Sequence, residues 1–140
     1  MNPVAPSAAE LEAHPLVRAA VETAWVDSQS IDPLSRHEEG GWIYFDPATG
    51  ELTVVRARPG QQAVINLSHP PEQVGYYVVG KFHTHPNPTA EGWTPGPSAG
   101  DLRVDARHGV PDLIRADDGI HYSGPDRRRG GLGGNPGYPA

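Results

Sequence analysis

The pattern of apolar and polar positions changes along the chain, and each pattern predicts a different element. From Pro15 to about Ser28, apolar residues recur every three to four positions, which is typical of one face of an amphipathic helix. The runs 42–45 and 52–57 are rich in β-branched and aromatic residues and flank a turn containing Pro, Asp and Gly, so they predict a hairpin. The run 74–83 is apolar almost throughout, which predicts a buried strand.

The second half of the chain predicts one more helix and a closing pair of strands. Residues 98–109 have helical spacing, and Gly109 is placed to end that helix. Residues 110–117 and 119–124 are expected to pair as strands, whereas residues 63–67 are compatible with either a short strand or a loop. Together these elements predict an α+β, three-layer α/β/α-like fold, with a mixed, mostly antiparallel central sheet flanked by helices.

Composition divides the chain into a folded centre and two ends. The 140 residues include 17 glycines and 16 prolines, which favour long loops. Residues 1–13 are small, polar and Pro-containing, and are expected to form a flexible N-terminus. Residues 125–140 are rich in Gly, Arg and Pro and are predicted to form a disordered tail. The expected domain therefore spans residues 14–124.

Charge and cysteine content exclude several functional classes. A net charge of −6 argues against a general nucleic-acid surface and against docking on anionic membranes. The absence of cysteine excludes disulfides, Cys-ligated zinc and thiol nucleophiles. We see no signal peptide and no apolar run near the roughly 20 residues of a membrane span, so a cytoplasmic location is expected.

Two histidines and one aspartate have the spacing of metal ligands. His83 and His85 follow the predicted strand at positions i and i+2, so their side chains can share one side of the chain. Ser98 and Asp101 lie three positions apart, on one face of a helical turn. Two imidazoles and one carboxylate would leave a fourth position for water, as in catalytic zinc sites. The same S-x-x-D pair is also typical of a helix N-cap, and the two interpretations are compatible.

The order of these motifs resembles that of the JAMM (MPN+/JAB) zinc metalloproteases, especially the bacterial members. The family motif is a glutamate on an early strand, then H-x-H-P, then S-x-x-D. This chain has Glu38 in EEGGWIY, HTHP at 83–86 and SAGD at 98–101. The resemblance covers about residues 15–124, and it implies the cytidine-deaminase-like JAB/MPN fold.

The resemblance also implies roles for individual residues. The family's ligands for one Zn²⁺ ion correspond to His83, His85 and Asp101. Ser98 corresponds to the serine that stabilises the oxyanion, and Glu38 corresponds to the general acid/base, with Glu39 as the alternative. The implied activity is hydrolysis of a peptide or isopeptide bond in a protein substrate, often after the C-terminal glycine of a ubiquitin-like protein. Two alternatives are a non-catalytic MPN-like interaction module and a toxin-like zinc hydrolase with another substrate.

One departure from the family pattern lies between the two motifs. Twelve residues, 86–97, separate His85 from Ser98, where the family has about seven. We interpret the difference as an inserted loop, which costs little free energy to accommodate. Trp93 in this loop is either an exposed anchor for a partner or a cover for its own loop.

Two further segments carry charges whose roles the sequence leaves open. Lys81 shares the face of His83, so a position near the metal is one alternative, but we expect it to be an exposed strand residue. The RRRGGLGG segment at 127–134 resembles the ending of ubiquitin-like proteins, so mimicry of a substrate is an alternative to a flexible end.

Overall fold

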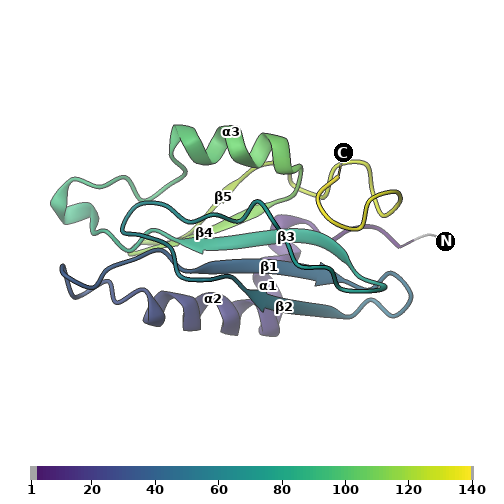
Figure 1. The fold of residues 1–140 in the computed structure, drawn as a ribbon, viewed down its shortest axis with the longest axis horizontal. Coiled ribbons are helices and arrows are strands. Elements are labelled where there is room, and N and C mark those ends of the chain that lie inside the picture. Colours follow the sequence, from purple (N-terminus) through teal and green to yellow (C-terminus); the bar gives the residue numbers. More distant parts are fainter. Residues whose placement is uncertain (1–2, 140) are drawn as a thin grey trace.

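The computed structural model describes residues 3–139 and contains one five-stranded sheet with helices on both faces (Figure 1). The helices are α1 (Ala8–Ala13), α2 (Pro15–Asp27) and α3 (Ala99–His108), with a short 3-10 helix, η1 (Thr89–Glu91). The strands are β1 (Gly40–Phe45), β2 (Leu52–Arg56), β3 (Tyr77–Thr84), β4 (Asp112–Ala116) and β5 (Gly119–Ser123). Among the described residues, none of the helices has the length and apolar character needed to cross a membrane.

The sheet has the strand order β2-β1-β3-β4-β5. The pair β3–β4 is parallel and the other three pairs are antiparallel, which confirms the predicted mixed, mostly antiparallel sheet of an α+β fold. The crossover between the two parallel strands carries the 86–97 loop and α3. Residues 63–67, which the sequence left open, form no strand.

Two apolar clusters on opposite faces of β1 hold the layers together. Ile43 and Phe45 pack with residues of α1 and α2, whereas Trp42 and Tyr44 belong to the second cluster. This separation is the alternation expected of a strand. Figure 1 shows α3 on the far side of the sheet from α2, so each face of the sheet is covered by helix.

A β-bulge in β3 decides which residues of that strand face α3. Ile43 pairs with Gly80 but the next residue of β1 pairs with Val78, so Val79 is the extra residue. As a result, Val79 and Phe82 both pack on the face covered by α1 and α2. In a regular strand, Lys81 would lie on the same face as Val79, because side chains two positions apart share a face. The bulge instead directs Lys81 and His83 toward α3.

Within the N-terminal segment for which the sequence predicts flexibility, residues 8–13 form helix α1. Ser7 caps α1 in a reciprocal capping box with Glu10, and Leu11 is completely buried. A Cβ atom added to Gly80 would lie 2.8 Å from Cδ1 of Leu11, so the missing side chain makes room for Leu11 on the sheet. This burial holds the N-terminal segment in place. Residues 1–2 lie outside the described residues.

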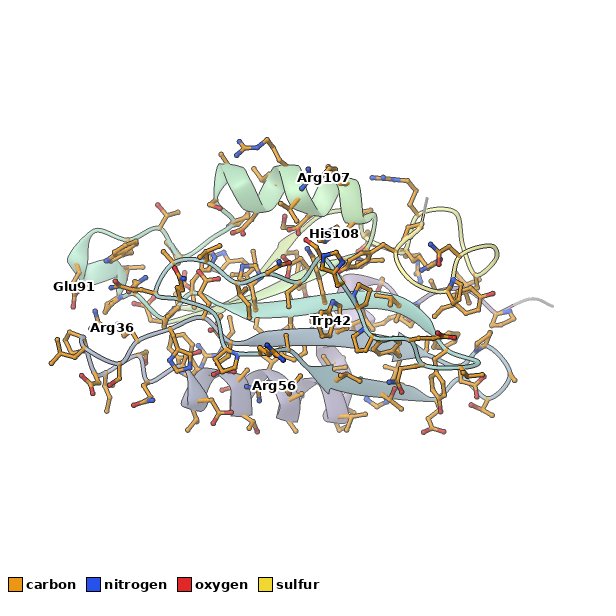
Figure 2. All side chains as sticks on the ribbon, viewed as in Figure 1. Arg36, Trp42, Arg56, Glu91, Arg107 and His108 are labelled. Carbon is orange, nitrogen blue, oxygen red and sulfur yellow. The ribbon has the colours of Figure 1, made fainter. Side chains whose placement is uncertain are left out.

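Residues 125–139, for which composition predicts disorder, pack against the folded centre in the structure. The buried guanidinium of Arg128 donates to the carbonyl oxygens of Val78, Gly131, Asn135 and Gly137. The Tyr138 ring stacks on His108 at 4.0 Å between centroids, and its hydroxyl contacts the indole nitrogen of Trp42 (His108 and Trp42 are labelled in Figure 2). Composition did not predict this packing, because the contacts that hold the tail come from only two side chains, Arg128 and Tyr138. Residue 140 lies outside the described part.

Candidate metal centre

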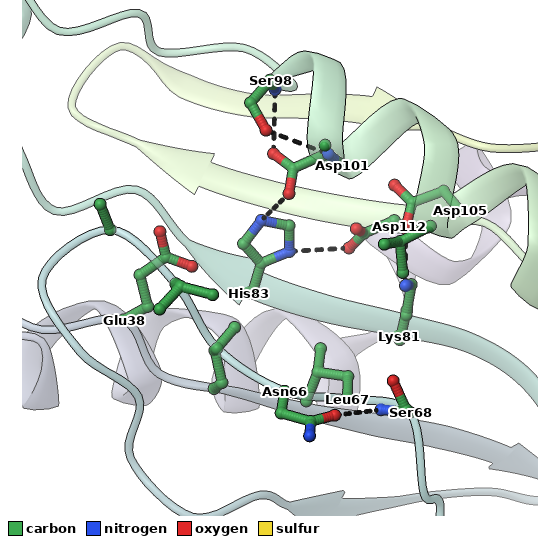
Figure 3. Close-up of a pocket in the computed structure, with 15 residues that line it drawn as sticks. Glu38, Asn66, Leu67, Ser68, Lys81, His83, Ser98, Asp101, Asp105 and Asp112 are labelled. Carbon is green, nitrogen blue, oxygen red and sulfur yellow. Dashed lines mark hydrogen bonds and ion pairs between the residues drawn. The ribbon is translucent and has the colours of Figure 1, made fainter.

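Two histidines and one aspartate bring their side chains to one point on the face covered by α3. His83 lies near the end of β3, and His85 lies just beyond it. Nε2 of His83 is 3.2 Å from Nε2 of His85. Asp101, in the first turn of α3, places Oδ1 3.5 Å from Nε2 of His83 and Oδ2 3.1 Å from Nε2 of His85. The structure therefore brings together the three residues expected to be metal ligands, and Figure 3 shows the contact of His83 with Asp101.

The spacing of these donor atoms fits a small divalent ion. Tetrahedral Zn²⁺ binds imidazole nitrogen and carboxylate oxygen at about 2.0–2.1 Å, which places neighbouring ligand atoms about 3.3 Å apart. Here the two imidazole nitrogens are 3.2 Å apart, and each lies 3.1 or 3.5 Å from a different oxygen of the Asp101 carboxylate. Three protein ligands of this chemistry leave one coordination position open, which is the arrangement of catalytic rather than structural zinc sites.

A buried glutamate lies beside the two histidines. A carboxylate oxygen of Glu38 and one nitrogen each of His83 and His85 lie within 4.8 Å of one another, so these three residues could hold a metal ion. Asp101 contacts both imidazoles at ligand-to-ligand distances, whereas the Glu38 carboxylate forms no hydrogen bond or ion pair within residues 3–139. We therefore favour Asp101 as the third ligand and Glu38 as a neighbour that can reach a water molecule.

The adjacent glutamate points to the other face of the sheet. The Glu39 carboxylate lies 2.7 Å from Nη2 of Arg56 and 2.5 Å from Nε2 of His37. Its backbone N–H donates to Oγ1 of Thr84. Successive side chains of an extended segment alternate, so the two glutamates face opposite ways. Of the two glutamates that the sequence left open, Glu38 is the one beside the histidines.

Each imidazole is oriented by an acceptor on its other nitrogen. Nδ1 of His83 lies 3.1 Å from Oδ1 of Asp112, a buried residue at the start of β4. Nδ1 of His85 lies 3.2 Å from the carbonyl oxygen of Pro95, in the 86–97 loop. An acceptor at Nδ1 fixes the tautomer in which Nε2 carries the lone pair for a metal. Sequence reasoning missed both acceptors, because only the parallel β3–β4 pairing and the loop path bring them near.

Ser98 and Asp101 form the predicted N-cap and also belong to the centre. The backbone N–H of Asp101 donates to Oγ of Ser98 at 3.0 Å, and the backbone N–H of Ser98 donates to Oδ2 of Asp101 at 2.9 Å. This capping box fixes the carboxylate while Oδ1 remains directed at His83. The Ser98 hydroxyl only accepts in the hydrogen bonds of the described residues, so its proton is available to a substrate.

Burial and opposite charges shift the pKa values of the site in different directions. Burial raises the pKa of the Glu38 carboxyl to about 7, although His83 and His85 act the other way. Burial lowers the pKa of His83, but the nearby carboxylates, chiefly Asp112, outweigh it and raise that pKa well above its usual value. Burial raises the pKa of Asp101, but its hydrogen bonds with the two histidines hold it well below its usual range. The metal-free centre therefore keeps a proton on His83.

The expected exposure of Lys81 is wrong. Its ammonium nitrogen lies 2.6 Å from Oδ1 of Asp105 and 2.7 Å from Nδ1 of His108, two residues of α3, and all three residues are buried. Burial lowers the pKa of His108 to about 4, so the imidazole is neutral and accepts from the lysine. The bulge in β3 directs Lys81 into this layer, and the pair with Asp105 anchors α3 over the sheet.

Two cavities meet at the candidate centre. One has a volume of about 460 Å³ and is lined by His83 and by residues 63–68. The other has a volume of about 320 Å³ and is lined by His85 and by the 86–97 loop. Glu38, Ser98 and Asp101 line both cavities. A substrate could therefore pass the candidate ligands with one part in each cavity.

Comparisons with protein-family models, with curated proteins and with solved structures found no match to this chain. A function for this protein must therefore be argued from the motif order in the sequence and from the geometry of the candidate centre.

Proposed function

We propose that this protein is a zinc-dependent peptidase or isopeptidase of the JAMM type, with the JAB/MPN fold. The observation that carries the proposal is the convergence of His83, His85 and Asp101 at separations of 3.1 to 3.5 Å, beside the buried carboxyl of Glu38. The order of Glu38, the H-x-H-P motif and the S-x-x-D motif supports the same proposal.

The proton-transfer role belongs to Glu38. A zinc ion held by the three ligands would supply a Lewis acid that polarises the scissile carbonyl and lowers the pKa of water toward about 7. Glu38 takes a proton from the attacking water and later donates it to the leaving amine. A carboxyl whose pKa burial raises to about 7 suits both steps near neutral pH.

Two further residues support the reaction. Ser98 donates a hydrogen bond from its hydroxyl to the oxyanion that develops on the substrate carbonyl. Asp112 is a positioning residue, because it accepts from Nδ1 of His83 and so holds Nε2 toward Asp101. Both supports come from rigid elements, the N-terminus of α3 and the start of β4.

We propose a ubiquitin-like protein or its conjugate as the substrate and a cytoplasmic site of action. Both follow from the resemblance and the chain's composition. A non-catalytic interaction module is the main alternative, and a toxin-like zinc hydrolase with another substrate is the second. The alternatives differ from the proposal in their dependence on Glu38 and in the bond that is cleaved.

The first test is elemental analysis for zinc, iron and manganese on wild-type protein and on the His83→Ala/His85→Ala variant. We expect about one equivalent of zinc in the wild type and none in the variant. Wild-type protein that stays metal-free after reconstitution would contradict the proposal.

The second test measures cleavage of linear and isopeptide-linked ubiquitin-like fusions. Glu38→Gln should keep its zinc and lose roughly 10³-fold in rate, because proton transfer is removed. Glu39→Gln is the matched control and should retain most activity. A zinc-loaded wild type that cleaves nucleic acid and no peptide bond would support the second alternative. A wild type that cleaves nothing but binds a protein partner equally well as Glu38→Gln would support the interaction module.

A further inference from the structure

The cavity on the His85 side is built largely by the inserted loop. Gly92, Trp93, Thr94 and Gly96 of this loop line it, and Ala63 lies in the opposite wall. The volume of about 320 Å³ lies within the range of small-molecule subsites. The insertion therefore adds a wall to the centre and leaves the cleft open.

An ion pair at the rim holds the loop in place. The two terminal guanidinium nitrogens of Arg36 donate to the carboxylate of Glu91, at 2.9 and 3.1 Å, and Nε donates to the carbonyl oxygen of Ser30 (Arg36 and Glu91 are labelled in Figure 2). The Arg36 side chain is 5% exposed and that of Glu91 is 51% exposed, and the bidentate geometry fixes the orientation of the two side chains.

Two more contacts hold the first part of the loop. Oδ2 of Asp117 accepts from both the backbone N–H and the hydroxyl of Thr89. The amide of Asn87 exchanges hydrogen bonds with Gln62, donating to its backbone oxygen and accepting from its side chain. These contacts hold residues 87–91, the segment that leads into the cavity wall, and so reduce the conformational entropy that the loop loses when a ligand enters.

The chemistry of the cavity walls favours an apolar occupant. The ionisable residues that line it, Glu38, His85 and Asp101, all belong to the candidate centre. The Asn87 side chain is already satisfied by Gln62. The remaining loop wall is glycine, threonine and the 42%-exposed indole of Trp93. An aromatic surface of this kind gains free energy when an apolar group covers it.

We infer that the 86–97 loop forms a specificity subsite in which Trp93 binds a large apolar or aromatic side chain of the substrate, next to the scissile bond. In a linear fusion cleaved after a C-terminal glycine, this side chain belongs to the residue that follows the bond. This inference rests on the proposed function and adds the side-chain class that the centre selects. The loop has a second effect on the same centre, because the Pro95 carbonyl oxygen accepts from Nδ1 of His85. The same segment thus orients the candidate metal ligand His85 and forms the wall of the neighbouring subsite.

The test is calorimetric binding of hydroxamates to the zinc-loaded protein. Acetohydroxamate has no side chain and reports only on the metal. Peptide hydroxamates and succinyl hydroxamates, each made with glycine and with phenylalanine at the flanking position, sample the two sides of the scissile bond. In one of the two series, the phenylalanine compound should bind wild type about tenfold more tightly than the glycine compound.

The variants separate the subsite from the metal. Trp93→Ala should abolish the phenylalanine preference and leave acetohydroxamate binding and zinc content unchanged, and Trp93→Phe should restore most of the preference. Val64→Ala, which alters only the cavity on the His83 side, is the matched control and should keep the preference. A preference that survives in Trp93→Ala, or no preference in either series with wild type, would overturn the inference alone. A wild-type protein that binds neither zinc nor acetohydroxamate would overturn the proposed function and the inference together.

Discussion

Oδ1 of Asp112 lies 3.1 Å from Nδ1 of His83, on the side of the imidazole opposite the nitrogen that faces Asp101. The two residues come from neighbouring parallel strands, in which Asp112 is paired with Lys81. A buried carboxylate, a histidine and a metal position in this order form an arrangement that raises the basicity of the imidazole and fixes its orientation.

Replacing Asp112 by asparagine should weaken zinc binding about 10- to 100-fold, because the imidazole loses its charged acceptor. A competitive titration with a chromophoric chelator measures the dissociation constant. Asp118→Asn is a matched control, since Asp118 also bonds an imidazole, that of His121 at 2.8 Å, but is exposed. If the two variants bound zinc with equal affinity, Asp112 would have no positioning role.

Zinc affinity should increase with pH near neutrality. The carboxylates around His83 raise its pKa well above the usual value, so zinc must displace a proton that the metal-free protein holds. The dissociation constant should fall about tenfold for each pH unit while His83 is protonated. Calorimetry in buffers of different ionisation enthalpy counts the protons released. No proton release at pH 7 would show that His83 is already neutral in the metal-free protein.

The metal-free wild type should lose stability relative to Glu38→Gln as pH rises. Burial raises the folded-state pKa of Glu38 to about 7 from 4.5, so the folded protein binds this proton more tightly than the unfolded chain. The contribution is fully present below about pH 4.5 and is lost as pH increases through 7. Urea unfolding with a chelator present should show a relative change on the order of 2 kcal/mol between about pH 5 and pH 8. If the difference in unfolding free energy between the two proteins stayed constant over this pH range, the Glu38 carboxyl would not be buried and neutral.

The C-terminal tail should contribute to the stability of the fold. Arg128→Met removes the donor to four carbonyl oxygens, and we expect the free energy of unfolding to fall by about 3 kcal/mol. Arg127→Met is the matched control: its side chain is 46% exposed, so the loss should stay below about 1 kcal/mol. Urea unfolding of both variants measures the difference. Similar losses in the two variants would indicate that the tail is not held by Arg128.

The position of the tail also bears on substrate mimicry. The tail contacts the beginning of β3, where the backbone N–H of Val78 donates to the carbonyl oxygen of Pro136. His83 lies near the opposite end of that strand, and none of the residues 125–139 lines either cavity of the centre. In this conformation the RRRGGLGG segment packs near the beginning of β3 and does not reach the candidate centre.

Local patterns were sufficient to predict most elements. The helix from Pro15, the hairpin, the central strand, the helix ended by Gly109 and the closing strands all appear, because their apolar spacing and caps are properties of neighbouring residues. Helix α1 was missed although Ser7 and Glu10 form a capping box that is visible in the sequence. Residues 1–13 contain few large apolar side chains, so no helical apolar pattern is visible there. The stability of α1 comes instead from the burial of Leu11 over Gly80.

The sequence by itself determined the candidate ligands and their chemistry. Positions i and i+2 in an extended segment place His83 and His85 on one side, and S-x-x-D places Asp101 in the first turn of a helix. Only the tertiary structure decided where these side chains meet and what surrounds them. The bulge at Val79 chose the face of β3, the parallel β3–β4 register supplied Asp112, and the path of the 86–97 loop supplied Pro95 and Trp93. These partners come from segments distant in the chain, and no local pattern specifies their approach.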